Sequence, residues 1–547
     1  MAVWSTNNFI GGMNDCIHPS LLKPDTAAYL KDVRLDNGKL CPALRNSLLE
    51  SDTTPSDLGH YGGPDRSVVQ WYGRHYWSLD NATVGVRYGT DDGDWDGEGT
   101  SWSESDGNAL GVPHCVYDNA EAQSSGNPMP SFAIGSADEE SGGMTGDYKY
   151  CLTLVDRNGF EGAPGSLTSY FKALTVGSIE GEGTDNEVRH RRSVTVSLNN
   201  VSLPANILYA KVWRTLDHGA DFYLVGTISG TAVDEFVQNN NWTLVDKMED
   251  SILLMRDPLT STDNDLPPEN GRYLCESLGV FFLAVGTRLH FSRQDNPHAW
   301  PTLNFIGFDE EITGIAPEFS GVLVFTRYST WRVTGAESHE TISRTLVPGH
   351  YGCSNHKSIS AISNAPIWVS GENICLWNGE SIEVVTHGRL APRALAITAS
   401  ASRDDKYYLF LTNGALVYDR KAGGAFYWLS TVADYAWRNE SDDQVYLQVG
   451  SDIQELGGDN APLEWSYVSP YIGGTDLLQR VYRYVTVSSD KATSLTVYLE
   501  DREVLAVPLP AGRNRVKLPL NIVGRWLQLK ITGKGELSEI AVIYGDN

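Results

Sequence analysis

The sequence predicts an all-β protein: a six-bladed β-propeller, interrupted by a small β-sandwich and followed by a C-terminal β-sandwich or sheet platform. One observation behind this prediction is a strand–turn–strand unit that recurs at nearly constant spacing between residues 279 and 457. Another is the composition, in which aromatic residues make up 10% of the chain and glycine occurs 53 times. Aromatic strands separated by glycine-rich turns are typical of all-β folds. No long segment carries the 3.6-residue apolar period of a helix.

The repeated unit consists of an apolar strand, a tight polar turn and a second apolar strand. Its first strands start at positions 42, 45, 40 and 38 residues apart, near Val280, Val322, Ile367, Tyr407 and Val445. A period of about 40–45 residues with several strands per unit is typical of propeller blades. The alternative is a run of unrelated hairpins, because regular strand spacing also occurs in sandwiches.

A similar unit occurs earlier, at residues 67–77, which read Ser-Val-Val-Gln-Trp-Tyr-Gly-Arg-His-Tyr-Trp. We therefore predict a first blade at 61–88 and the remaining five at 271–460. A ring of blades in which an early strand pairs beside a late one leaves no open sheet edge. Residues 1–60 read as an irregular N-terminal arm with little core of its own, in which Asp36-Asn37-Gly38 marks a turn.

Residues 89–146 are dense in Gly, Asp, Ser and Glu, and they predict long acidic loops. Within them, residues 92–97 read Asp-Gly-Asp-Trp-Asp-Gly, which matches the first half of a calcium-binding loop. The second half does not match, because the twelfth position is Ser103 and Glu104 comes one place late. A solvated acidic loop at 92–98 is the alternative, and we assign no metal ligand there.

Alternating apolar residues characterise residues 147–255, where every second residue from Tyr148 to Leu154 is apolar. Several such strands within one short region predict an inserted β-sandwich of fibronectin type III character. A linker rich in Pro and Asp follows at 256–270. Alternating strands return in residues 463–547 and predict the C-terminal β domain.

The chain carries 42 Lys and Arg against 69 Asp and Glu, a formal net charge of −27. Such a chain is a poor candidate for gripping nucleic acid, because that binding depends on Lys and Arg at phosphates. Solubility is the ordinary explanation of the charge. The alternative is a surface past which a polyanion slides without binding. That surface requires a close-fitting passage, because repulsion fades beyond about 8 Å at physiological salt.

The cysteines and the apolar runs indicate where the chain assembles. Seven cysteines are scattered without a Cys-x-x-Cys pair, which predicts reduced thiols and assembly in a cytoplasm. The first residues, Met-Ala-Val-Trp-Ser, lack the charged and apolar regions of a signal peptide. The longest apolar run, 278–285, is too short to span a bilayer, so no membrane-spanning segment is expected.

Three adjacent acidic residues, Asp309, Glu310 and Glu311, precede a predicted strand and are the best candidates for acid–base chemistry. Paired carboxylates about 5–10 Å apart can hydrolyse glycosidic bonds. Neighbours on a strand point to opposite faces, however, so at most Asp309 and Glu311 share one. Solvated charge at a strand end, or charge that lines a channel, is the alternative.

His350 and His356 bracket Cys353, which suggests a Cys–His nucleophile pair, but no third group accompanies them. A packed Cys among turn residues is the alternative. The tight basic run 189–192 would contact a phosphate or an acidic neighbour, or else protect a strand edge. The chain holds no phosphate-binding loop, dinucleotide fingerprint or His-Glu-x-x-His motif. Our leading hypothesis, a structural protein without catalysis, predicts that it is not an enzyme. We assign it no catalytic, cofactor-binding or metal-binding residue and no cofactor.

Taken in order, these segments resemble the tail nozzle proteins of short-tailed bacteriophages (podoviruses), also called tail tubular or packaged-DNA stabilisation proteins. The likeness rests on short motifs in a fixed order: Phe9-Ile10-Gly11-Gly12, Leu35-Asp36-Asn37-Gly38 and Arg45 in the arm; 148–154, 159–164 and 212–215 in the sandwich; 323–326, 331–335 and 351–358 in the blades; and 524–544 in the closing sheet. The acidic stretch 89–146 has no counterpart in the family.

The resemblance implies a virion structural protein that forms a ring of six copies in the tail, below the portal and its adaptor ring. The bore of this hexamer would retain the genome and conduct it during ejection, and double-stranded DNA would pass the acidic wall without specific binding. Tail fibres or spikes, and a needle or plug, would attach to the ring, which assembles in the host cytoplasm. The alternative function is a virion propeller that binds or degrades carbohydrate at a receptor. A cell-surface adhesion module is a third class, weakened by the missing secretion signal.

Overall fold

The computed structural model describes most of the chain in five long stretches: 2–50, 271–438, 443–473, 478–519 and 522–546. It also describes shorter stretches: 67–71, 74–78, 84–88, 108–109, 131–137, 144, 148–156, 159–164, 193–199, 207–229, 243–265 and 267–268. The chain divides into two units, Met1–Ser67 with Phe308–Thr334 and Ser343–Asn547, and Val68–Gly307 with Gly335–Ile342. Each unit is described by itself.

Six four-stranded antiparallel groups form the repeated part of the described chain: five are separate sheets, and the sixth, at residues 397–429, is one end of a nine-stranded sheet. In five of the six groups the strands pair in chain order as a meander. Two belong to the second unit: β8 (Ser67–Trp71), β9 (Arg74–Ser78), β10 (Val84–Tyr88) and β11 (Asn108–Ala109); and β18 (Arg272–Ser277), β19 (Val280–Val285), β20 (Arg288–Phe291) and β21 (Phe305–Gly307). Four belong to the first unit: β22 (Ile312–Glu318), β23 (Gly321–Thr326), β24 (Thr330–Thr334) and β25 (Ser343–Leu346); β26 (Ser360–Ile362), β27 (Ala365–Ser370), β28 (Asn373–Trp377) and β29 (Ile382–Val384); β30 (Ile397–Arg403), β31 (Lys406–Leu411), β32 (Gly414–Asp419) and β33 (Ala425–Leu429); and β34 (Tyr435–Arg438), β35 (Val445–Val449), β36 (Asp452–Pro462) and β7 (Leu44–Glu50).

Each of the five repeated units found in the sequence is the central hairpin of one of these four-stranded groups. Residues 321–333 form β23 and β24, for example, and residues 406–418 form β31 and β32. The β31–β32 turn needs Gly414, whose φ is +144° and where an added Cβ would lie 2.6 Å from the carbonyl oxygen of Leu429. A four-stranded meander repeated at this spacing is a propeller blade, so the predicted fold class is confirmed.

Small residues line the first strand of a blade where it packs between its neighbours. In β30, hydroxyl-bearing side chains alternate with alanines and donate to carbonyl groups of the adjoining blades. Thr398 Oγ1 donates to the carbonyl oxygen of Ala433 at 2.5 Å, and Ser400 Oγ donates to that of Ile359 at 3.1 Å. Short side chains let the strands approach closely, and the hydroxyls satisfy carbonyl groups that would otherwise be buried without a partner.

The N-terminal segment is more regular than the arm predicted from sequence. It contains seven strands, β7 and six others: β1 (Ala2–Thr6), β2 (Gly12–Met13), β3 (Thr26–Ala27), β4 (Tyr29–Lys31), β5 (Val33–Asp36) and β6 (Lys39–Pro42), with a 3-10 turn, η1 (Pro19–Leu21). Phe9, Leu30, Val33 and Leu40 are at most 2% exposed and belong to the main core of the first unit. β2, β3 and β4 are too short to show alternation in the sequence, and β1, β4, β6 and β7 have partners hundreds of residues away.

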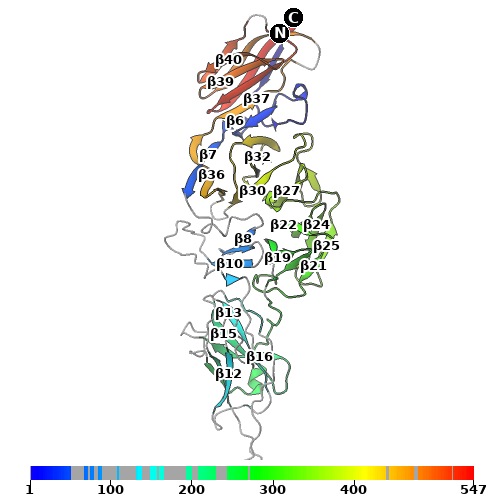
Figure 1. Cartoon of the computed structure of the whole chain (residues 1–547), viewed down its shortest axis with the longest axis vertical. Coiled ribbons are helices and arrows are strands. Elements are labelled where there is room, and N and C mark those ends of the chain that lie inside the picture. The colour runs from blue at the N-terminus through cyan, green and yellow to red at the C-terminus, as the bar shows by residue number, and fades with distance from the viewer. Residues whose placement is uncertain are drawn as a thin grey trace, which may run out of the picture. The chain divides into compact units, whose positions relative to one another are not determined.

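The strands of this segment join sheets that are distant in sequence. β7 pairs with β36 and completes the last blade, so an early strand does pair with a late one as predicted. β4 lies between β33 and β37 (Trp465–Val468), and β1 and β6 pair with β44 (Leu537–Asp546). The two termini therefore lie side by side (Figure 1).

The inserted region folds into two three-stranded sheets that enclose their own core. One sheet consists of β12 (Ser131–Ala137), β14 (Ser193–Asn199) and β17 (Thr243–Asp246); the other of β13 (Tyr150–Asp156), β15 (Ile207–Thr215) and β16 (Phe222–Ile228). Leu152, Val196 and Val212, each 0% exposed, lie in the core, as does Leu253 of the short helix α1 (Asp250–Leu253). The sandwich begins earlier than predicted, because β12 lies within the stretch 89–146 that the composition predicts as loops and pairs with β14.

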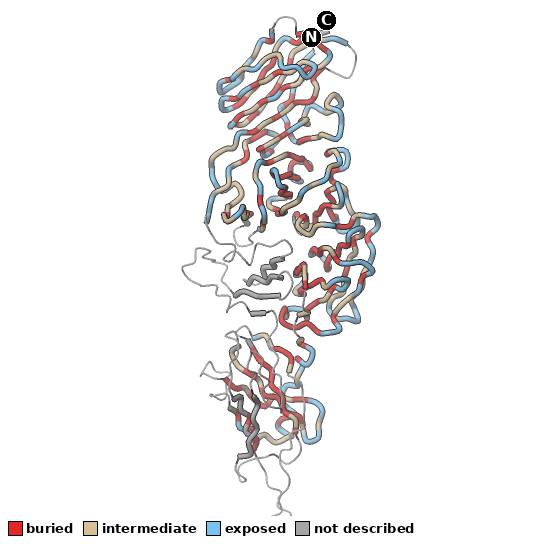
Figure 2. The backbone as a smooth tube through the Cα atoms, in the orientation of Figure 1, coloured by how far each residue is buried: buried red, intermediate tan, exposed pale blue. Residues whose placement is uncertain are grey.

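The C-terminal residues form a β-sandwich, one of the two architectures that the sequence predicts for them. Its strands are β37, β44 and six more: β38 (Arg480–Ser489), β39 (Thr493–Leu499), β40 (Arg502–Leu509), β41 (Gly512–Lys517), β42 (Val523–Gly524) and β43 (Leu527–Gly533). One sheet runs β41–β38–β44–β6–β5, with β1 and β42 beside it, and the other contains β37–β43–β39–β40. Trp465, Val485 and Leu529 are 0% exposed between them. Buried positions alternate with less buried ones along β39 and β43 (Figure 2). In the described part of the chain, no helix has the length and apolar character needed to cross a membrane.

Candidate functional site

The predicted acid–base candidates, Asp309, Glu310 and Glu311, are exposed and directly precede β22. The side chain of Asp309 is 83% exposed, and its Oδ1 atom lies 3.9 Å from Nη2 of Arg344 on β25, the last strand of the same blade. Catalytic acid carboxyls of glycosidases are sheltered from water so that they hold a proton near neutral pH. The surroundings of Asp309 are those of a hydrated surface charge.

The predicted nucleophile, Cys353, is 0% exposed and packs among apolar side chains. Its Sγ atom lies 3.2 Å from the carbonyl oxygen of Asn355 and 3.6 Å from Oγ of Ser358. Burial raises the pKa of the Cys353 thiol to about 11, and burial lowers the pKa of His356 to about 4. Both groups are therefore neutral at pH 7, and a thiolate nucleophile is disfavoured. His350 is exposed.

Two other sequence candidates, the acidic loop at 92–98 and the basic run at 189–192, lie outside the described residues. Within the residues that the structure does describe, no group of three His, Cys, Asp or Glu side chains is placed to hold a metal ion.

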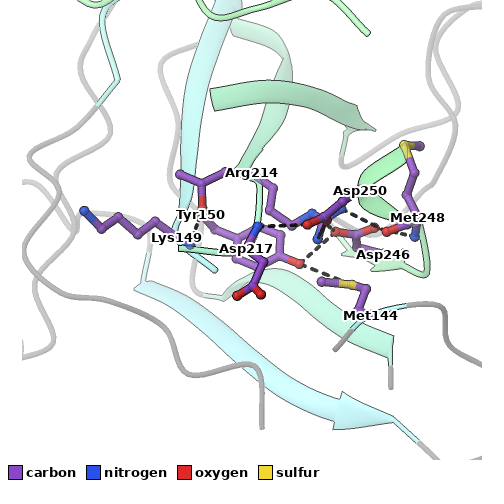
Figure 3. Close-up of polar contacts among 9 residues, drawn as sticks. Met144, Lys149, Tyr150, Arg214, Asp217, Asp246, Met248 and Asp250 are labelled. Atoms are coloured by element: carbon purple, nitrogen blue, oxygen red, sulfur yellow. Dashed lines mark hydrogen bonds and ion pairs between the residues drawn. The ribbon is translucent and has the colours of Figure 1, made fainter. Parts of the chain in front are cut away.

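Among the residues that the structure describes, the most extensively buried ionic cluster lies in the inserted sandwich, around Arg214 of β15 (Figure 3). Its Nε atom is 3.0 Å from Oδ2 of Asp246, and its Nη1 atom is 3.1 Å from Oδ1 of Asp250. Nη2 donates to the carbonyl oxygen of Met248 at 2.9 Å. The guanidinium carbon also lies 4.3 Å from the ring centroid of Tyr148, a cation–π contact. Nη2 of Arg214 is thus hydrogen-bonded, whereas Nε and Nη1 face carboxylate oxygens at ion-pair distance without the geometry of a hydrogen bond.

The electrostatics of this cluster follow from its burial. The side chains of Arg214 and Asp246 are 0% exposed. Burial raises the pKa of the Asp246 carboxyl, and the Arg214 charge opposes that rise. Burial also raises the pKa of Tyr150 well above its ordinary value, with the Asp246 charge as a further cause. The Tyr150 hydroxyl therefore keeps its proton and donates it to Oδ2 of Asp246 at 2.7 Å.

The cluster fixes one end of the sandwich rather than exposing a reactive group. Asp250 is the first residue of α1, and its Oδ2 atom accepts a hydrogen bond from the backbone N–H of Asp217 at 2.8 Å. Arg214 consequently ties the β15–β16 turn, β17 and α1 together (Figure 3). In the sequence, Arg214 stands out only through the short 212–215 motif, because its partners Asp246 and Asp250 are more than 30 residues away.

A second buried carboxylate links two blades of the first unit. Oε1 of Glu318, at the end of β22, accepts from Nε of Arg332 at 2.7 Å and from Oγ of Ser320 at 2.6 Å. Its Oε2 atom accepts from Nε1 of Trp377 on β28, in the next blade, at 3.3 Å. Burial alone would raise the pKa of Glu318, but the hydrogen bonds outweigh it and hold the pKa below the ordinary value. The sequence contains no motif that marks this contact.

No protein-family model matches the sequence, and no curated protein matches it. Among solved structures, the WD40 domain of Neurospora crassa Pan2 is similar at 6% identity, covering 48% of this chain and 82% of that chain, with a TM-score of 0.25. BamB from Moraxella catarrhalis is similar at 8% identity, covering 59% of this chain and 95% of that chain, with a TM-score of 0.26. The C-terminal WD40 domain of Sif2 is similar at 10% identity, covering 45% and 88%, with a TM-score of 0.21. At such TM-scores the likeness carries no argument about function, and the fold assignment rests on the strand pairing described above.

Proposed function

We propose that this chain is a structural, non-catalytic virion protein, a tail nozzle subunit of a short-tailed bacteriophage that forms a ring of six copies around an acidic bore. The observation that carries the proposal is the order of its modules. An N-terminal segment completes the last blade, a sandwich is inserted after the first blade, further blades follow, and a second sandwich ends the chain. The motifs that resemble the nozzle family occur in this same order.

The way in which the N-terminal segment joins blades and sandwich suits the wall of a conduit. β4 is hydrogen-bonded on one side to the blade strand β33 and on the other to the sandwich strand β37. Leu30, on β4, is 1% exposed, and Phe9 packs edge-on against Tyr467 of β37 with ring centroids 5.6 Å apart. A joint made of ladder hydrogen bonds and a shared core resists bending more than a flexible linker does.

The distribution of charge along the chain supports an acidic bore. Residues 89–146 contain twelve Asp and Glu and no Lys or Arg. Residues 463–547 contain ten Lys and Arg against nine Asp and Glu, so the preceding 462 residues carry a net charge of −28. A wall with the sign of the DNA backbone repels phosphates within about 8 Å at physiological salt, which keeps a moving genome from binding to it.

The described chemistry-bearing side chains favour a structural role over a catalytic one. Asp309 is a hydrated surface charge paired loosely with Arg344. The Cys353 thiol is neutral and packed in a core. The buried charges of Arg214 and Glu318 are each used to hold elements together.

Native mass spectrometry and electron microscopy of the full-length chain test the proposal. Rings of six copies are expected, together with no shift of a double-stranded DNA fragment at physiological salt, and immunogold labelling should place the chain in the tail of the assembled particle. A monomer at every concentration, with virions that lack the chain, would reject the nozzle. Hydrolysis of a bacterial surface polysaccharide that is lost in Asp309→Ala or Glu311→Ala would instead establish the carbohydrate alternative.

A further inference from the structure

Three cations alternate along β41, the edge strand of the seven-stranded sheet in the C-terminal sandwich. Arg513, Arg515 and Lys517 are all exposed, and because alternate residues of a strand point the same way, they share one face. β41 pairs with β38, and it is at one end of the strand order among the described residues. The three cations therefore border an open sheet edge.

The strand register places these cations on the outer face of the sandwich. Arg515 lies opposite Thr486, and Lys517 lies opposite Tyr484. Val485, between Thr486 and Tyr484, is 0% exposed and points into the core. The cations consequently face away from the core.

The positive charge of this strand is only partly compensated. Arg513 Nη2 lies 2.9 Å from Oε1 of Glu539; the Arg513 side chain is 67% exposed and that of Glu539 is 32% exposed. Arg515 lies over the ring of Tyr484, with its guanidinium carbon 4.1 Å from the centroid; such stacking orders the cation without neutralising it. No Asp or Glu among the described residues forms an ion pair with Arg515 or Lys517. Arg515 and Lys517 are thus exposed cations that can pair with an anionic group of another molecule.

The same outer face continues into an apolar strip. Tyr484 lies opposite Ile543 of β44, and Ile543 lies opposite Val3 of β1. Lys517, Tyr484, Ile543 and Val3 therefore form one row across four strands, and Val3 is 62% exposed. We call this surface, made of Arg513, Arg515, Lys517, Tyr484, Ile543 and Val3, the β41 face. An apolar strip beside charged groups is the composition of a protein-binding surface.

We infer that the β41 face docks on an acidic surface of a second copy of this chain and is the contact that joins neighbouring subunits of the ring. The inference rests on the proposed function. Every copy carries a net charge of −28 over its first 462 residues, so each copy offers the complementary sign. Two β41 faces packed against each other would instead oppose like charges. The contact is therefore head-to-tail, and a head-to-tail contact closes into a ring when its rotation fits.

A charge reversal tests this contact. The variant R513E/R515E/K517E is compared with the variant K23E/K421E/K534E, which makes the same change in net charge at three exposed lysines elsewhere. Oligomer mass is measured by analytical ultracentrifugation at about 0.05 M and about 0.5 M salt, which lie below and above physiological ionic strength and so screen charges less and more strongly. A third variant, R513K/R515K, keeps the charge. Circular dichroism and thermal melts establish that each variant is folded.

The wild-type chain, the control and R513K/R515K should all assemble, and high salt should weaken their assembly. R513E/R515E/K517E should raise the apparent dissociation constant of the oligomer at least tenfold, because like charges that face each other across an interface weaken binding by this much or more. If the wild type and R513E/R515E/K517E assemble equally well, the β41 face is not the contact between subunits, but the proposed ring is unaffected. If neither the wild type nor any variant assembles, the proposed ring is wrong as well. If the wild type and R513E/R515E/K517E assemble equally well but only the wild type binds a DNA fragment, the β41 face is a polyanion-binding surface and the inference is overturned.

Discussion

Nε of Arg214 lies 3.0 Å from Oδ2 of Asp246, and neither side chain is exposed. Arg214 belongs to β15 and Asp246 to β17, which are in different sheets, so the ion pair crosses the interior of the inserted sandwich. Removing two charges from water is costly, and the cost is offset only when the remaining donors and acceptors are satisfied. Here Nη2 of Arg214 donates to the Met248 carbonyl and Asp246 accepts from the Tyr150 hydroxyl, while Nε and Nη1 of Arg214 are held by the charges of Asp246 and Asp250 without a hydrogen bond. The pair therefore fixes how the two sheets are aligned.

Arg214→Met should destabilise the sandwich by about 3–5 kcal/mol, because it leaves Asp246 buried without its cation. Urea unfolding measures the loss. Arg34→Met is the control, since Arg34 pairs with Asp36 at 2.9 Å but both side chains are nearly half exposed, and it should cost less than about 1 kcal/mol. Replacing both partners, as Arg214→Met with Asp246→Leu, should recover part of the loss. Equal costs for Arg214→Met and Arg34→Met would contradict a dominant role for the buried pair.

The blades were predictable from sequence because each central hairpin carries its own signal. In 406–418, two apolar strands flank Asn413-Gly414, and the turn geometry selects the glycine. The N-terminal segment was not predictable in the same way. β2, β3 and β4 are two or three residues long, which is too short for a period of two to be visible, and β4 is defined by its contacts with strands almost 400 or more residues away.

Buried charges were the least predictable feature of the molecule. Arg214 sits in an ordinary alternating strand, and only the folded chain brings Asp246 and Asp250 to it. Glu318 likewise reads as a strand-end charge, yet its side chain is 2% exposed. Asp309 is one of the residues that do stand out in the sequence. It has acidic neighbours in the sequence, and such a cluster of like charges is tolerated because the side chains are exposed to water. A search for charged residues that are neighbours in the sequence therefore finds charges at the surface. Buried ion pairs escape such a search because their partners are far apart in the sequence.

Glu318→Gln should lower the free energy of unfolding by about 1–3 kcal/mol at pH 7, because the charged hydrogen bonds to Arg332 and Trp377 are weakened. The pKa of Glu318 is held below 4.5 in the folded protein, so its contribution is present above that pH and is lost as pH falls through the folded pKa. The difference between wild type and Glu318→Gln should therefore shrink in acid.

Denaturant titrations of both proteins across the acid range measure this difference. Glu311→Gln is the matched control, because Glu311 is exposed at the other end of the same strand region, and it should change stability by less than about 0.5 kcal/mol. A gap between wild type and Glu318→Gln that widens in acid would show that the buried carboxyl is stabilised in its protonated form.

Alkylation at neutral pH should modify Cys16 and spare Cys353 and Cys375. Cys16 is exposed. Burial raises the pKa of Cys353 to about 11 and that of Cys375 to about 12, and alkylating reagents attack the thiolate. Peptide mass spectrometry identifies the modified positions, and Cys16→Ser should lose the corresponding adduct. Modification of Cys353 as fast as Cys16 in the folded chain would restore the Cys–His nucleophile hypothesis.

Leu30→Ala should destabilise the first unit by about 2–5 kcal/mol, because it opens a cavity at a fully packed site. Leu30 is 1% exposed on β4, which is paired with both β33 and β37. Leu21→Ala is the control, since Leu21 is 64% exposed in the neighbouring η1 turn. If β4 couples the blades to the terminal sandwich, amide hydrogens of β33 and β37 should lose exchange protection together in Leu30→Ala. Loss of protection on one side only would show that the two parts unfold independently and that the N-terminal segment does not join them into one mechanical wall.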